Sequence, residues 1–271
     1  MRILTVIVAL SCVVAIVFGS IHWKQKIATV STEEVIATTN IENDKDPKTD
    51  EKTMETKDIS IEEMTSSLPA EAASKLIVAK ETDDTVEIVI VGSEANTMGD
   101  RIWPDIFKEK MNETYGEMVN ITVFDIQNVT TEMVVSDELH MEAVKQNTDI
   151  IILEPFMLND NGAVTIDDTL VNIQTIIEDF KAVNKEAYIF LQPAHPIYNA
   201  TFYPLEVEQL KTLAENEGHT FIDHWKNWPD YQSEEIKDYI LYDSASIAPN
   251  EKGHEVWAEY ITDLFIATKQ E

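Results

Sequence analysis

The hydrophobic and polar positions divide this 271-residue chain into three parts. Residues 3–18 are almost wholly apolar, and a stretch near that length can cross the hydrocarbon core of a membrane as a helix. Residues 30–84 are rich in Thr, Glu, Asp and Lys, so they cannot bury enough apolar area to offset the entropy of ordering them. We therefore predict a membrane anchor over residues 1–28, an acidic disordered stalk over residues 29–84, with a transient helix around Pro69–Lys80, and a folded domain over residues 85–271.

The apolar N-terminal segment has a competing interpretation as a cleaved signal peptide. A cleavage site needs small residues at the end of the apolar run, and Gly19-Ser20 is followed at once by the bulky Ile21-His22-Trp23. Cys12 raises the possibility of a lipoprotein, although it lies inside the apolar run rather than at its end. We favour an uncleaved single-pass anchor with the folded domain outside the cell; secretion after signal cleavage is the alternative.

From Thr85 onward, apolar runs of strand length alternate with segments of helical periodicity. The first run, Val86 to Val91, ends at Gly92 and fits a strand that is buried on both faces. Further strands are expected at 121–124, 149–153, 187–191 and 221–222, and helices at 103–115, 130–146, 166–180, 205–217 and 250–268. Five strands that alternate with helices predict a parallel sheet with helices on both faces, a three-layer α/β/α sandwich. Ligands of such folds bind beyond the carboxyl ends of the strands.

The charge and cysteine content narrow the possible functions. The chain carries 50 Asp and Glu residues against 20 Lys and Arg residues, a formal net charge of −30. This excess repels phosphate groups, so it argues against nucleic-acid binding and favours solubility in a saline or cation-rich setting. The only cysteine lies in the apolar segment, and no spacing resembles a known metal motif. We therefore expect no structural disulfide in the domain, no metal and no other cofactor.

Polar residues follow two of the predicted strands and also precede the last predicted helix. The three segments are Gly92-Ser93-Glu94, Met157-Leu158-Asn159-Asp160 and Pro249-Asn250-Glu251-Lys252-Gly253. In kind and order they resemble the blocks of the SGNH (GDSL-type) hydrolases, which read Gly-Asp-Ser, Gly-x-Asn-Asp and Asp-x-x-His-Pro-Asn-x-x-Gly. The resemblance covers about Thr85–Ala267 and implies a flavodoxin-like sandwich with a parallel five-stranded sheet.

The chain departs from the family pattern at the residues that carry the chemistry. Aligned strictly, Ser93 falls on the family's Asp and Glu94 falls on its serine nucleophile; slipped by one residue, Ser93 becomes the candidate nucleophile. Ala245 and Ala248 stand where the family has its Asp and its His base. Alanine can neither accept a proton nor orient an imidazole, so the base must come from elsewhere if the chain is an enzyme of this kind.

For an active relative, the resemblance implies ester hydrolysis through an acyl-serine intermediate. We predict Ser93 as nucleophile, His254 as base, and the Asn159 side chain with the Ser93 amide as the donors that bind the oxyanion. The competing interpretations are local: Ser93 caps the next turn, Asn159 forms an Asx turn, and His254 packs against the start of the last helix. The predicted supporting residues are Glu94, Asp160, His195, Asp223, His224 and Glu251.

The predicted function is a cell-surface serine esterase that acts on an ester-bearing carbohydrate or lipid, either removing O-acyl groups from wall or capsular polysaccharide or cleaving small lipid esters. One alternative is an inactive binding or scaffolding protein of SGNH fold, which Glu94, Ala245 and Ala248 favour. Another is an O-acyltransferase, because water and sugar acceptors use the same acyl-enzyme. Aromatic residues after the fourth and fifth strands either form a sugar-stacking wall or pack in the core; they are Tyr198, Phe202, Tyr203, Trp225, Trp228 and Tyr231.

Overall fold

The computed structural model describes residues 59–242 and 247–267 of the chain. The predicted anchor, and the predicted stalk up to residue 58, lie outside the described residues. The fold described is that of the unit Lys57–Glu271. Within the described part, no helix is both long enough and apolar enough to cross a membrane.

The centre of the domain is a parallel five-stranded sheet in the order β2-β1-β3-β4-β5. Its strands are β1 (Val86–Gly92), β2 (Val119–Asp125), β3 (Ile150–Leu153), β4 (Tyr188–Leu191) and β5 (Thr220–Phe221). β1 is paired on both sides, in register with β2 from Val86 and with β3 from Ile88. The predicted parallel sheet is confirmed, and its order brings the residues that follow β1, β2 and β3 to one stretch of the sheet edge.

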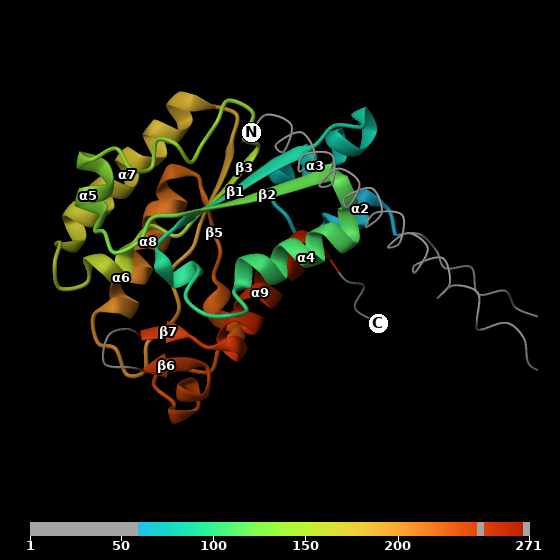
Figure 1. Cartoon of the computed structure of the whole chain (residues 1–271). Coiled ribbons are helices and arrows are strands. Elements are labelled where there is room, and N and C mark those ends of the chain that lie inside the picture. Colours follow the sequence, from blue (N-terminus) through green and yellow to red (C-terminus); the bar gives the residue numbers. More distant parts are fainter. Residues whose placement is uncertain (1–58, 243–246, 268–271) are drawn as a thin grey trace, which may run out of the picture. The chain divides into compact units, whose positions relative to one another are not determined.

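Helices cover both faces of the sheet, as the strand pattern predicted (Figure 1). One face carries α3 (Ala70–Thr82), α4 (Trp103–Tyr115) and α9 (Glu251–Phe265), which pack on strand residues such as Ile88 and Ile150. The other carries α5 (Thr131–Ser136), α7 (Ile166–Val183) and α8 (Tyr203–Glu217), which pack on strand residues such as Val89 and Ile151. Because successive strand residues point to opposite faces, an uninterrupted apolar run supplies both cores.

The folded domain begins earlier than predicted, which corrects the assignment of residues 59–84 to the stalk. α2 (Ile61–Met64) and α3 belong to the domain, and Ala72 and Leu76 of α3 are fully buried. The Ala267 amide donates to the Met64 carbonyl, which ties the start of the domain to its end. The composition concealed this because α3 buries mostly alanines, whose small side chains pack closely while contributing little apolar bulk.

The predicted helix over 130–146 is wrong in length, because α5 ends at Ser136. Glu138 has a left-handed backbone, with φ of 53°, which an α-helix does not accommodate. The buried His140 then hydrogen-bonds to the Val134 carbonyl and, through Nε2, to Asp179 of α7 at 2.8 Å. These hydrogen bonds hold the chain after α5 in place without continuing the helix.

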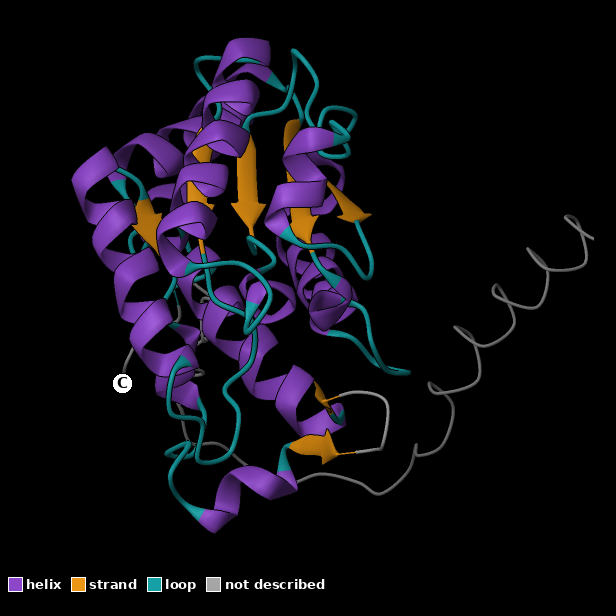
Figure 2. Ribbon diagram, turned by 90° about the vertical axis from the view of Figure 1, so that its left-hand side faces the viewer, coloured by secondary structure: helices purple, strands orange, loops and turns teal. Residues whose placement is uncertain are grey.

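Short elements complete the carboxyl edge of the sheet. They are the 3-10 helices η1 (Glu94–Asn96), η3 (His224–Asn227) and η4 (Glu234–Asp238), the single helical turn α6 (Met157–Asp160), and an antiparallel pair of strands, β6 (Ile240–Tyr242) and β7 (Ile247–Pro249). A further 3-10 helix, η2 (Gly116–Met118), instead lies at the amino edge, directly before β2. Figure 2 shows the β6–β7 pair beyond the arrowheads of the parallel strands, which mark their carboxyl ends. β7 leads directly into α9.

Candidate functional site

The candidate site lies where the loops after β1 and β3 meet at the carboxyl edge of the sheet. Gly92 makes this approach possible, because a Cβ atom there would lie 2.3 Å from Asn96 Nδ2 and 2.8 Å from the Glu154 carbonyl oxygen. Atoms do not approach so closely without displacement. The glycine therefore allows the two loops to touch.

Ser93 is fully buried and its hydroxyl is held by a carboxyl group. Its Oγ donates to Glu154 Oε2 at 2.5 Å, and its backbone N–H donates to the same oxygen at 2.8 Å. The hydroxyl also accepts from the Ala95 amide at 3.3 Å, which makes Ser93 the cap of η1. Each of these contacts fixes the side chain inside the protein.

Glu154 itself has no solvent exposure, and its Oε1 forms no hydrogen bond among the described residues. Burial raises the pKa of this carboxyl to about 7, although the hydrogen bonds from Ser93 lower it in part. A buried ionised carboxylate is costly unless it is well paired, so the neutral form is favoured here more than in water.

The Glu94 carboxylate accepts hydrogen bonds from two residues. In the strict alignment, Glu94 occupies the position of the family's nucleophile. Asn159 Nδ2 lies 3.2 Å from Glu94 Oε1 and 3.1 Å from Oε2, and the Asn128 backbone N–H donates to Oε2 at 2.9 Å. Asn128 has a left-handed backbone, with φ of 57°, which asparagine tolerates better than most residues. We call Glu94, Asn128 and Asn159 the carboxylate cradle.

Asp160 holds the turn that presents Asn159. It is buried, and its carboxylate accepts from the Thr131 amide at 2.7 Å, from the Thr131 hydroxyl at 2.5 Å and from the Thr169 hydroxyl at 2.6 Å. These bonds join α6 to α5 and α7. Asp160 therefore acts as a positioning residue, and it makes the Asn159 amide a fixed donor.

No hydrogen bond joins His254 to Ser93 within the described residues. His254 is buried at the start of α9, where Nδ1 accepts from the Trp103 amide at 3.2 Å and Nε2 donates to the Met98 carbonyl at 2.9 Å. Burial lowers the pKa of the imidazole. Both ring nitrogens thus serve to attach the loop before α4 to α9. Glu251 is exposed in the first turn of the same helix.

The other predicted histidines are also buried. His224 is in contact with the Pro193 carbonyl through Nε2 and accepts from the Trp228 indole through Nδ1, and its ring stacks on Trp257 at 4.3 Å. Neither ring nitrogen of His195 forms a hydrogen bond among the described residues. Burial lowers the pKa of each of these two histidines to about 3, so both are neutral.

Asp223 pairs with lysines rather than with a histidine. Its carboxylate lies 3.2 Å from the Lys226 ammonium and 4.0 Å from that of Lys211, and no hydrogen bond in the described structure links it to an imidazole. Among the described residues no group of three or more His, Cys, Asp or Glu side chains is arranged to hold a metal ion.

Sequence reasoning missed two members of this site, Glu154 and Asn128. Glu154 had a signal, because an acidic residue directly after a wholly buried strand has to be desolvated. Asn128 had none, since only the neighbouring position of β1 and β2 makes its backbone amide a donor to Glu94.

Comparison with solved structures identifies the fold. The chain is similar to a member of the lipolytic protein G-D-S-L family from Veillonella parvula, with a TM-score of 0.51 and 17% identity over 67% of this chain and 98% of that one. It is also similar to a protein named as a GDSL-like lipase from Parabacteroides merdae, with a TM-score of 0.54 and 11% identity over 67% and 96% of the two chains. The domain therefore has the SGNH hydrolase fold, and the predicted three-layer sandwich is confirmed. No protein-family model and no curated protein matches the chain.

Proposed function

We propose that this protein is a ligand-binding member of the SGNH fold class that does not form an acyl-serine intermediate. The observation that carries the proposal is the position of the Glu94 carboxylate, which accepts from both the Asn159 side-chain amide and the Asn128 backbone N–H. Fixed donors of this kind stabilise an oxyanion only if they are free to meet it. Here an anionic side chain of the protein already occupies them, and it repels any second negative charge.

The positions of the other predicted catalytic residues support the proposal. Ser93 is fully buried and its hydroxyl hydrogen bonds to Glu154. Ala248 stands at the family's base position, and both nitrogens of His254 are bonded to backbone groups. A serine nucleophile needs an approach for the substrate as well as a base, and the full burial of Ser93 argues against such an approach.

The test is labelling of the full-length protein with a fluorophosphonate probe, run beside hydrolysis of p-nitrophenyl acetate. An active serine esterase serves as the positive control, and the Ser93→Ala variant as the matched negative control. We expect no covalent label and the same slow ester hydrolysis in the wild-type protein and the variant. Stoichiometric labelling that disappears in Ser93→Ala would overturn the proposal.

That overturning result would support a second candidate, the serine esterase or acyl hydrolase. Its supporting observations are the fold, the lipolytic names of the structural neighbours, and the 2.5 Å bond from Ser93 Oγ to a carboxyl group whose pKa is about 7. In that reaction the ionised Glu154 would accept the hydroxyl proton while Ser93 Oγ attacks the acyl carbon. The ester C–O bond would then break, and the proton would pass from Glu154 to the departing alcohol. Water would then release the acid, or a sugar hydroxyl would take the acyl group in transfer.

The proposed location is the cell surface, where the apolar segment over residues 3–18 would anchor the protein in the membrane. Its support is the sequence alone. Fractionation of cells that express the full chain is expected to place it in the membrane pellet, and removal of residues 1–28 to release it. Recovery of a shortened wild-type chain in the medium would instead indicate cleavage of a signal peptide.

A further inference from the structure

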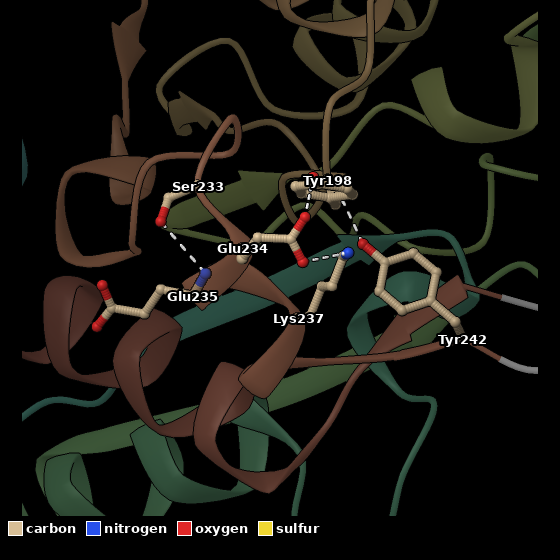
Figure 3. Close-up of polar contacts among 6 residues, drawn as sticks. All are labelled: Tyr198, Ser233, Glu234, Glu235, Lys237 and Tyr242. Atoms are coloured by element: carbon tan, nitrogen blue, oxygen red, sulfur yellow. Dashed lines mark hydrogen bonds and ion pairs between the residues drawn. The ribbon is translucent and has the colours of Figure 1, made fainter.

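Two tyrosines and an ion pair that contact one another lie beside the carboxyl edge of the sheet. Tyr198 belongs to the loop after β4, Tyr242 ends β6, and Glu234 and Lys237 belong to η4 (Figure 3). We call these four residues the tyrosine rim. It is distinct from the carboxylate cradle, and none of the four has a part in the chemistry considered above.

Hydrogen bonds and a cation–π contact hold the rim rigid. The Tyr198 backbone amide donates to the Tyr242 hydroxyl at 3.0 Å, so it fixes the end of the Tyr242 ring. The Tyr198 hydroxyl donates to Glu234, which also pairs with Lys237 at 2.5 Å. The Lys237 ammonium lies 3.9 Å from the centre of the Tyr198 ring. Each member therefore restrains another, and the tyrosine rings are held in place before any ligand binds.

Although it is fixed, Tyr242 leaves 45% of its surface exposed. Ile247 is its cross-strand partner in the β6–β7 pair and is exposed as well. Nearby in sequence, Phe202 of the same loop as Tyr198 is 70% exposed. Of the six aromatic residues predicted as a sugar-stacking wall, by contrast, Tyr203 and Trp228 are buried in the core. The exposed aromatic surface here thus includes Tyr242 of the rim and the neighbouring Phe202, and not Tyr203 or Trp228.

We infer that the tyrosine rim binds a neutral polysaccharide, a step that rests on the proposed binding function and names its ligand class. An aromatic ring that is ordered in advance can stack on the apolar face of a sugar without a further loss of side-chain entropy. The exposed Glu234 and Lys237 offer an acceptor and a donor to sugar hydroxyls, and their opposite charges balance. Glu235 and Asp238 of η4 are also exposed, so the neighbouring surface is acidic. The net charge of −30 disfavours anionic polymers and anionic membrane surfaces.

The experiment measures retention of the full-length protein on two insoluble neutral polysaccharides, a β-glucan and chitin. Polygalacturonate and phosphatidylglycerol vesicles serve as anionic probes. We expect retention on at least one of the neutral polymers, little change between low and high salt, and no binding to the anionic probes. The Tyr242→Ala variant is expected to bind about tenfold more weakly, and Tyr242→Phe about threefold, because the ring then loses its bond to the Tyr198 amide.

Two further variants separate sugar stacking from simple apolar contact. Tyr242→Leu keeps an apolar side chain without a ring, so it should bind as weakly as Tyr242→Ala if sugar stacking is the mechanism. The matched control is Val171→Ala on α7, an exposed apolar residue far from β6 in the sequence, which should bind as the wild type does. Circular dichroism checks that each variant is folded.

Undiminished binding by Tyr242→Leu, or preference for the vesicles, would overturn the inference in favour of an apolar or lipid partner. Failure to bind either neutral polymer would also overturn it. These results are independent of the fluorophosphonate assay, so the glycan inference can fail while the proposed absence of serine chemistry stands, and the reverse.

Discussion

The Asn159 side-chain amide donates to both carboxylate oxygens of Glu94, at 3.2 and 3.1 Å. Asn159 is the residue for which the sequence predicted an oxyanion role, and Glu94 takes the nucleophile's position in the strict alignment. Their contact means that a side chain of the protein satisfies the donor expected to serve the reaction. Substitutions at this contact, and in the packing that supports it, have distinct expected outcomes.

The first prediction exchanges the two partners of this contact. Asn159→Asp places two carboxylates together and removes a bond to a charged group, so we expect it to lower the free energy of unfolding by about 1–3 kcal/mol. The double variant Glu94→Gln with Asn159→Asp restores an amide–carboxylate pair and should recover at least about 0.5 kcal/mol. Urea denaturation of the wild type, both single variants and the double variant measures the coupling. Additive effects would show that the contact contributes nothing.

The second prediction concerns Ser93→Ala. The change removes the hydroxyl that bonds Glu154 and leaves a buried acceptor with only the Ser93 backbone amide, so we expect a loss of about 1–3 kcal/mol in unfolding free energy. A purely catalytic serine behaves in the opposite way, since its removal abolishes turnover and leaves stability almost unchanged. Denaturation and esterase assays on the same preparation distinguish the two roles.

The third prediction is a pH dependence that originates at Glu154. Its pKa in the native protein is about 7, above its ordinary value of 4.5. The native state therefore holds this proton more tightly than the unfolded chain does. The stabilisation is fully present below about pH 4.5 and is lost as the pH rises toward 7. A shift of this size corresponds to on the order of 3 kcal/mol.

Glu154→Gln tests this dependence because glutamine still offers Ser93 an acceptor but cannot ionise. Relative to the wild type, the variant should gain stability between about pH 4.5 and 7.5, as measured by urea denaturation at closely spaced pH values. The comparison is needed because His195 and His224 act in the opposite sense. Their pKa values are lowered to about 3, so their contribution is lost as the pH falls below about 6.5. A difference that does not vary with pH would refute the prediction.

The fourth prediction concerns the glycine between the two loops. Gly92→Ala introduces a Cβ atom 2.3 Å from Asn96 Nδ2 and 2.8 Å from the Glu154 carbonyl oxygen, so the loops must separate. We expect a loss of about 3 kcal/mol or more in unfolding free energy. Gly116→Ala is the matched control, because that position has a φ of 61° but no atom within 4 Å of the new Cβ. It should lose only about 1 kcal/mol from backbone strain. Equal losses would mean that the clash is relieved without cost.

The sequence by itself determined the layers of the fold. Uninterrupted apolar runs such as Val86–Val91 require a strand buried on both faces, and helical periodicity between the runs requires a parallel sheet. Trp103–Tyr115 was predicted with the bounds that α4 has. The spacing of apolar residues along the chain indicates which side of each element is buried, so the sequence alone predicts these elements. The start of the domain was missed because the alanines of α3 carry too little apolar surface to stand out from the polar segment before it.

Only the tertiary structure decided which polar residues meet. Ser93 and Glu154 are 61 positions apart, and Glu94 and Asn159 are 65 apart, so no local pattern couples them. They meet because β1 lies directly beside β3, which brings the loops after these two strands together at one edge. The same packing turned His254 toward Trp103 and Met98, since the start of α9 lies against the loop before α4. Residue type determined which groups were available, and strand order determined their partners.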